Sequence, residues 1–315
     1  IPYLCRYAAG VLDAQLRATG IFGDEPKLSL TIEADELRAR RLEPARRAGL
    51  VNTIVETPPS TNRISAAYAD GIGDLDVGME WWNGGSTTIT AKVPLIWDSQ
   101  HPIPVLAKKG DVRGRADFDR MPLQAVLAWM AGVVNVEGIL EGSVTAQGRA
   151  QDPKFVGSVV LSDGRVNLRS VGQTLEDVTG RAIFDEDGVT VTDLRVKDAG
   201  GTAIVNGRLG FKRLKLQTTD IGVDANAFPV RQEGSIVTRI SGNARMIAKF
   251  EDEGIDGEVR LRKLELDIPE SSATPQDLAP HPEVFFVGQS DEPVRRSTPY
   301  RVRLDVKSED RLIIR

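Results

Sequence analysis

The sequence predicts a mostly β protein: one elongated, curled antiparallel sheet in the form of a half-pipe with an apolar groove. Three observations lead to this fold. Apolar and polar residues alternate through many runs, which is the period-two pattern of half-buried strands. The 30 glycines and 17 prolines interrupt these runs, and aromatic residues make up only 5% of the chain, which favours many turns over a compact core. Little else in the sequence could cover the apolar side of such a sheet.

The clearest ladder of strands lies between residues 138 and 211. Alternate positions are apolar, and the positions between them are polar or charged. Arg165, Asn167 and Arg169, which follow the Ser162-Asp163-Gly164 step, are examples of the polar positions. This step predicts a turn between two strands. Thr192-Asp193 interrupts the alternation without ending it, as does the residue pair after Leu261, and both predict β-bulges, which raise local twist and curvature.

The first strands repeat the pattern of this ladder. The glycine and alternation pattern from Gly10 to Gly20 aligns with that from Gly138 to Gly148, a period of 128 residues (138 minus 10). Pro26-Lys27-Leu28 then aligns with Pro153-Lys154-Phe155. The repeat indicates that one structural unit recurs along a single axis.

This organisation predicts four segments. Residues 1–98 form a first half-pipe segment with a charged insertion at about 35–62, expected as a solvated loop or short helix, with a partner-binding basic patch as the alternative. Residues 99–269 form the second segment, 270–298 a Pro/Ser-rich loop around one short strand, and 299–315 the start of a further β segment. Since the chain starts and stops abruptly, we expect a piece of a longer protein with any membrane anchor outside it.

One short helix is expected at residues 122–131 (PLQAVLAWMA), with proline at its first position and Gly132 after its end. Gln124 is its only polar residue, so the helix should be buried nearly all round. Its length of ~15 Å is half of a ~30 Å hydrocarbon core, which excludes a transmembrane span. It would cap the end of the apolar sheet, or act as a plug or gate in a groove.

The sequence offers no catalytic or metal chemistry. Cys5 is the single cysteine, His101 and His281 are the two histidines, and no nucleophile elbow, zinc motif or phosphate loop is present. We therefore expect no enzyme and no cofactor. The net charge of −5 also argues against a nucleic-acid partner, because such binding needs clustered Lys and Arg.

The apolar face is the feature that needs an explanation, because an apolar sheet face must be covered, curled on itself or filled with ligand. A curled sheet with an open groove would hold phospholipid acyl chains across its strands. The residues expected to line this groove are Leu140, Val144, Phe155, Val159, Leu161, Val166, Leu168, Val189, Val191, Val205, Leu209, Val259, Leu261, Val302 and Leu304.

The spacing of glycines and apolar residues from Gly138 to Gly207, continued at Gly257 to Pro269 and Arg301 to Leu304, resembles the TamB family, the inner-membrane subunit of the translocation and assembly module. The resemblance implies a β-taco in the periplasm of a diderm bacterium, anchored in the inner membrane through a segment outside this chain. It also implies phospholipid transport to the outer membrane and an Omp85-type barrel partner of the TamA or BamA kind, contacted through parts outside this chain.

The leading hypothesis is thus a passive lipid-transfer conduit that supports outer-membrane biogenesis. A second hypothesis is a chaperone or scaffold that offers the groove or its strand edges to nascent outer-membrane β-barrel or autotransporter strands. A third, a β-helical adhesin or polysaccharide-active enzyme, would need a filled interior and an exposed carboxylate cluster.

Overall fold

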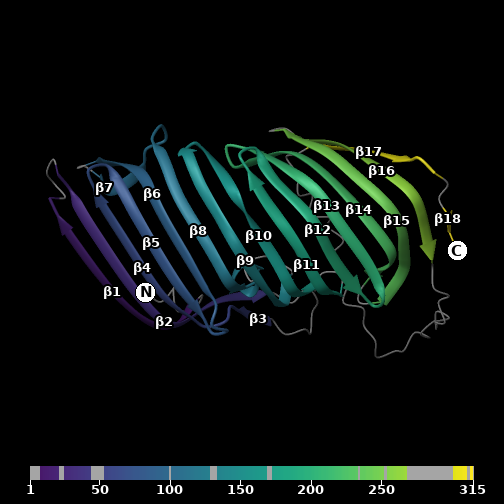
Figure 1. Cartoon of the computed structure of the whole chain (residues 1–315), viewed down its shortest axis with the longest axis horizontal. Coiled ribbons are helices and arrows are strands. Elements are labelled where there is room, and N and C mark those ends of the chain that lie inside the picture. Colours follow the sequence, from purple (N-terminus) through teal and green to yellow (C-terminus); the bar gives the residue numbers. More distant parts are fainter. Residues whose placement is uncertain are drawn as a thin grey trace, which may run out of the picture.

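Nearly the whole described chain is β-strand, joined into a single sheet in this computed structural model (Figure 1). The structure describes residues 8–20, 25–43, 53–98, 101–127, 133–168, 172–232, 235–251, 254–267, 301–310 and 313–314. In chain order the elements are β1 (Ala8–Thr19), β2 (Lys27–Glu43), β3 (Thr53–Glu56), β4 (Ser60–Ala69), β5 (Ile72–Trp81), β6 (Ser86–Asp98), β7 (His101–Leu106), β8 (Asp111–Pro122), α2 (Gln124–Leu127), β9 (Val133–Arg149), β10 (Asp152–Leu168), β11 (Gln173–Asp185), β12 (Gly188–Asp198), β13 (Gly201–Lys212), β14 (Lys215–Gln232), β15 (Ser235–Glu251), β16 (Gly254–Asp267), β17 (Arg301–Ser308) and β18 (Ile313–Ile314).

The strands pair with their sequence neighbours, as in a long meander. Antiparallel pairing runs from β1 to β16, while β3 lies beside the end of β2 and β7 beside the end of β6. At the C-terminal end, β17 and β18 pair with β16 in parallel. The predicted antiparallel sheet is confirmed, and the parallel pairing at its end is an additional feature.

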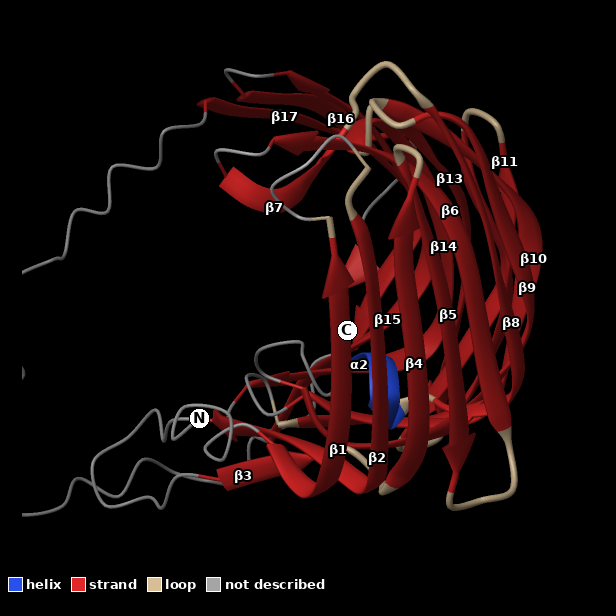
Figure 2. Cartoon of the chain, turned by 90° about the vertical axis from the view of Figure 1, so that its left-hand side faces the viewer, coloured by secondary structure: helices blue, strands red, loops and turns tan. Residues whose placement is uncertain are grey.

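The sheet curls into an open half-pipe, which Figure 2 shows in end view. The strands bend along their own length, and α2 lies inside the curl near its lower side. The pipe axis crosses the strands, from the purple N-terminal strands to the yellow C-terminal ones in Figure 1. The predicted mostly β half-pipe is therefore confirmed.

A series of β-bulges crosses the sheet and accounts for the bend within the strands. Each bulge adds one residue with a φ of 46° to 51°, a left-handed backbone that Asp and Asn adopt more readily than most residues. We call the strand parts between the bulges and the upper turns of Figure 1 the upper wall, and the parts beyond the bulges the lower lip. The bulge residues are Glu36, Arg120, Asn135, Asp163, Asp177, Asp193, Ala227 and Lys263.

Side chains on neighbouring strands satisfy backbone groups that the bulges expose. The Asp193 N–H donates to Oδ1 of Asn206 at 2.8 Å, and the Ala227 N–H donates to Oγ of Ser241 at 2.9 Å. Opposite the Asp163 bulge, Gly138 has a φ of 135°, and an added Cβ there would lie 3.0 Å from the Cα of Gly164. Gly10 lies against the Glu36 bulge in the same way. The repeated glycine thus makes room for a bulge on the next strand.

Two predicted bulges are confirmed and one predicted turn is wrong. The register shifts between Val191 and Leu194, and Lys263 forms the bulge expected after Leu261. The Ser162-Asp163-Gly164 step, in contrast, lies inside the continuous strand β10. An aspartate with left-handed φ serves either a turn or a bulge, so the local sequence does not separate the two.

The loop or short helix expected in the charged insertion at 35–62 is also wrong for the described part. Strand β2 continues to Glu43, and β3 and β4 follow within the same range. Leu37 is half-buried while Glu36 and Arg38 are exposed, so the charged residues alternate with apolar ones and preserve the strand period. Residues 44–52 lie outside the described part.

The expected helix at 122–131 is only partly correct. α2 is described from Gln124 to Leu127, and Pro122 closes β8 instead of opening the helix. Pro122 and Leu123 are buried, but Val126 is 45% exposed, so the helix is not buried all round. Residues 128–132, and the loop expected at 270–298 with its short strand, lie outside the described residues.

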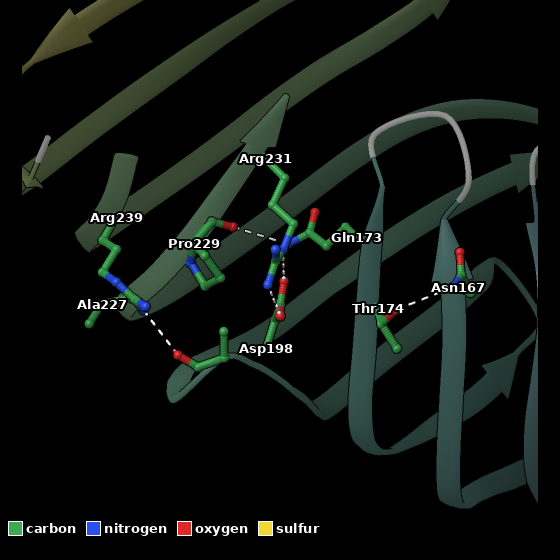
Figure 3. A network of polar contacts seen from close by, with 9 residues as sticks. Asn167, Gln173, Thr174, Asp198, Ala227, Pro229, Arg231 and Arg239 are labelled. Carbon is green, nitrogen blue, oxygen red and sulfur yellow. Dashed lines mark hydrogen bonds and ion pairs between the residues drawn. The ribbon is translucent and has the colours of Figure 1, made fainter. Parts of the chain in front are cut away.

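A network of polar contacts joins strands across the lower lip (Figure 3). Gln173 on β11 donates from Nε2 to the carbonyl oxygen of Pro229 on β14 at 3.1 Å, so it reaches across the end of the β12–β13 hairpin. Arg231 on β14 donates from Nε and Nη2 to the two carboxylate oxygens of Asp198 at 3.0 Å each. Arg239 on β15 donates to the carbonyl oxygen of Ala199 at 3.1 Å. These contacts join β11, β12, β14 and β15 in the curled part of the sheet.

Candidate functional site

The concave face of the sheet is identified by what packs against α2. Leu123, the residue before α2, forms a buried cluster with Val136 and Val166, and Leu140 and Leu161 pack against this cluster. Figure 2 shows α2 inside the curl, so the side chains that pack in this cluster belong to the concave face of the sheet. Residues paired with these positions on neighbouring strands lie on the same side of the sheet. We call this concave surface the inner face.

The inner face is apolar throughout the upper wall of β9–β13. Leu140, Gly142, Val144, Ala146 and Gly148 on β9 pair with Leu161, Val159, Gly157, Phe155 and Pro153 on β10. The register continues through Gly180, Ala182 and Phe184 to Val189 and Val191, and then to Leu209, Gly207 and Val205. None of these positions carries a charge or a hydrogen-bonding side chain.

Glycines on this face bring neighbouring strands and branched side chains close together. Gly142 lies opposite Val159, and Gly157 lies opposite Val144. A Cβ at Gly142 would lie 2.1 Å from the carbonyl oxygen of Ser158, and one at Gly157 would lie 2.1 Å from that of Ser143. Their φ values of 141° and 154° also disfavour other residues. The wall at β9–β10 therefore depends on glycine.

The predicted groove residues fall into three groups. Leu140, Leu161, Val166 and Leu168 pack in the cluster at the bend, where Val166 is buried. Val302 belongs to β17 and pairs with Ile255, and its side chain lies outside the described part. The remaining residues lie on the inner face and are partly exposed: Val144, Phe155, Val159, Val189, Val191, Val205, Leu209, Val259, Leu261 and Leu304.

A cavity of about 300 Å³ lies on the inner face of the N-terminal strands. Leu16, Leu28, Leu30, Leu75 and Leu95 are among the residues that line it. Tyr68, also in its wall, stacks on Trp97 with ring centroids 5.5 Å apart. The predicted groove residues omit this region, although its alternation and its repeat relation to β9–β10 were visible in the sequence.

A second cavity, of about 240 Å³, lies at three adjacent upper turns. Phe155, Phe184 and Phe211 contribute to its wall together with Pro153 and Val189. Carboxylates and cations from the turns border the same cavity: Asp152, Lys154, Asp185, Glu186, Asp187 and Arg213. Phe155 was among the predicted residues, but Phe184 and Phe211 were not, because each comes at the end of a strand next to a charged turn.

The outer face carries the charges that the inner face lacks. Arg208 donates to both carboxylate oxygens of Asp185 at 2.6 and 2.7 Å, and Arg245 does the same to Asp220 at 2.7 and 2.6 Å. The hydrogen bonds from Arg208, followed by the Asp187 backbone N–H, lower the pKa of Asp185 to about 2. The guanidinium of Arg245 lowers the pKa of Asp220. Both carboxylates remain ionised at neutral pH and keep this face hydrated.

No group of three or more His, Cys, Asp or Glu side chains in the described ranges could hold a metal ion. Within the same ranges, no helix is both long enough and apolar enough to cross a membrane.

The comparison with protein families gives one match. Residues 192–315 match the family model of the TamB C-terminal domain, which confirms the family that the sequence pattern resembles. At the level of the family, this match indicates a role in the translocation and assembly module and a place in the cell envelope. Neither the curated proteins nor the solved structures give a match to this chain.

Proposed function

We propose that this chain, whose residues 192–315 match the TamB C-terminal domain, is a segment of a lipid-transfer conduit in the periplasm between the inner and outer membranes. In this function the inner face solvates the acyl chains of phospholipids while their headgroups remain in water along the open side. No bond is made or broken. Transport along such a surface would serve the biogenesis of the outer membrane, and an Omp85-type barrel of the TamA kind would be the partner there.

One observation carries the proposal: the apolar inner face is continuous over the upper wall of β9–β13 and is only half-covered. Val159 and Val205 keep part of their surface exposed although their neighbours on the same face are also apolar. Exposed apolar surface costs about 25 cal/mol per Å² in water, so a bound acyl chain that covers it is stabilised. Contiguous exposed apolar surface of this kind marks a binding site.

The strand geometry suits acyl chains. The upper wall of β10 between Pro153 and Leu161 spans nine residues, or about 30 Å at ~3.3 Å each. This length exceeds the ~15 Å of one lipid tail in half of a ~30 Å hydrocarbon core. A tail can therefore lie along a strand of this wall without meeting a polar side chain.

A charge on the inner face tests the proposal. Val159→Asp should strongly reduce the phospholipid that copurifies with the chain, because a carboxylate there would contact the acyl chains. Ser158→Asp is the matched control, since Ser158 is the adjacent residue on the opposite face and is exposed. Bound lipid is measured by mass spectrometry of gently purified protein, and circular dichroism checks that both variants keep their strands.

Equal lipid binding by Val159→Asp and Ser158→Asp would contradict the proposal. Photocrosslinkers at Val159 that capture unfolded outer-membrane barrel protein in place of phospholipid would instead favour the chaperone or scaffold function.

A further inference from the structure

The cavity at the three upper turns combines features that recognise a particular headgroup. Its wall continues the inner face through Phe155, Phe184 and Val189, and Phe211 extends it toward the rim. Phe211 is 38% exposed, and Leu214 beside it is 64% exposed. An apolar surface that ends at a charged rim is where the junction between acyl chain and headgroup would lie.

The turns that form this cavity are tied together. The Phe211 N–H donates to the carbonyl oxygen of Asp187 at 3.0 Å, which joins the β13–β14 turn to the β11–β12 turn. The Arg213 N–H donates to Oδ1 of Asp152 at 2.9 Å, which joins it to the β9–β10 turn. These bonds link residues far apart in the sequence, so the cavity is preformed by the fold.

The charges around the cavity are mixed, with carboxylates in excess. Its lining includes four carboxylates, Asp152, Asp185, Glu186 and Asp187, and two cations, Lys154 and Arg213. Asp185 lies on the outer face, where Arg208 binds it, so the other three carboxylates exceed the two cations by one. This negative charge favours a ligand with a positive group. Phenylalanine faces attract the same kind of group, because a cation within about 6 Å of a ring is stabilised by the ring quadrupole.

The carboxylates differ in how firmly they are held. Asp185 is bound on the outer side by both guanidinium nitrogens of Arg208. The Asp187 side chain is 85% exposed, and its ion pair with Lys154 is long, at 3.7 Å; Lys154 also lies 3.9 Å from Asp152. Exposed ion pairs of this length contribute little. A ligand ammonium can therefore replace Lys154 beside Asp187, which frees Lys154 for a phosphate.

We propose that this cavity is a headgroup subsite for zwitterionic phospholipids that carry an amine, of the ethanolamine type. The ammonium group lies between the phenylalanine rings and Asp187, the phosphate lies toward Lys154 and Arg213, and the acyl chains pass onto the inner face. An anionic glycerol headgroup has the phosphate but lacks the ammonium, and the excess of carboxylates repels it. This inference rests on the proposed lipid-transfer function and assigns it a preferred substrate.

The first experiment measures headgroup selection by the whole chain of residues 1–315. The protein is incubated with vesicles of equal amounts of phosphatidylethanolamine and phosphatidylglycerol with identical acyl chains, and the bound lipids are quantified by native mass spectrometry. The wild type should be enriched in phosphatidylethanolamine. Phe184→Leu combined with Asp187→Asn should lower the bound ratio about threefold to fivefold, because it removes one ring and the most available carboxylate.

Asp70→Asn is the matched control, since Asp70 is an exposed turn residue between β4 and β5, away from this cavity. It should keep the wild-type ratio. Thermal unfolding followed by circular dichroism should show that all variants are folded. A second experiment needs no acyl chain: soluble glycerophosphoethanolamine should shift the amide NMR signals of Asp187 and Gly188, whereas glycerophosphoglycerol should not.

The outcomes separate the subsite from the function on which it rests. If the wild type binds both lipids in the vesicle ratio and glycerophosphoethanolamine shifts no signal at these turns, the subsite is wrong while lipid binding by the inner face stands. If the wild type takes up no lipid but glycerophosphoethanolamine still shifts these signals selectively, the conduit function fails and the amine-binding cavity stands. A ratio that is unchanged in the double variant also contradicts the subsite.

Discussion

The upper wall and the lower lip are made from the same strands, yet their inner faces are used differently. In the lower lip and at the bend, apolar side chains converge because they lie on the inside of a curve. Val178, Val196 and Ala203 form one buried cluster there, with Phe228 packed against it. In the upper wall, Val159 and Val205 have apolar neighbours beside them on the inner face and stay partly exposed.

Polar groups show the same division. In the lower lip, Asp198 occupies an inner-face position and is buried. It forms an ion pair with Arg231, whose side chain is 19% exposed. In the upper wall, ion pairs such as Arg245–Asp220 lie on the outer face, and both side chains are well exposed. The comparison indicates that the lower lip stabilises the curl, whereas the upper wall supplies the apolar surface on which the proposed function depends.

Truncating one leucine in each region tests this division with the largest expected effect. Leu123→Ala should lower the free energy of unfolding by about 2–4 kcal/mol, because Leu123 is 5% exposed and its loss leaves a cavity at the bend. Leu209→Ala should cost about 1 kcal/mol, since that side chain is already partly in water. Urea denaturation followed by circular dichroism measures both. Equal losses would show that the upper wall is packed as tightly as the bend.

The two kinds of ion pair give the next largest difference. Asp198→Asn should destabilise the protein by about 2 kcal/mol, because it leaves the Arg231 guanidinium without its carboxylate in a largely buried position. The matched variant Asp220→Asn removes a carboxylate from the exposed pair with Arg245 and should change the unfolding midpoint much less. A midpoint shift for Asp220→Asn as large as that for Asp198→Asn would contradict the assignment of the lower lip as the stabilising region.

The sequence predicts the upper wall better than the lower lip. Alternation identifies Val144, Val159, Val205 and Leu209 as one face, because the side-chain period of a strand is two and the register follows from it. It also predicts the bulge at Asp193. These are local properties, and they were sufficient for the fold class.

The lower lip depends on information that is not local. The sheet curls over the β12–β13 hairpin and so brings Gln173 to Pro229 and Asp198 to Arg231. No sequence pattern predicts that these residues are in contact. The phenylalanines at the upper turns were missed for a related reason: Phe184 and Phe211 come together through the pairing of β11–β14 and through hydrogen bonds between turns. The strands are also longer than their alternating runs suggest, because bulges extend them where turns were expected.

The smallest expected effect concerns pH and lies on the outer side of the upper wall. Arg208 lowers the pKa of Asp185 to about 2 in the folded protein, below the ordinary 3.8. A carboxylate with a lowered folded pKa stabilises the fold above its ordinary pKa, and this contribution is lost as the pH falls from about 4 toward 2. Asp185→Asn should therefore lower the melting temperature slightly at pH 5 to 7, and the difference from wild type should shrink as the pH approaches 2.

Asn should preserve the hydrogen bond to the Asp187 backbone N–H, which isolates the effect of the charge on Arg208. Because both side chains are nearly half exposed, salt should reduce the difference at neutral pH as well. A difference that persisted unchanged at pH 2 would mean that Asp185 acts through packing or through its backbone contact. In that case packing would stabilise the upper turns as it does the lower lip, and the difference between the two regions would not extend to these turns.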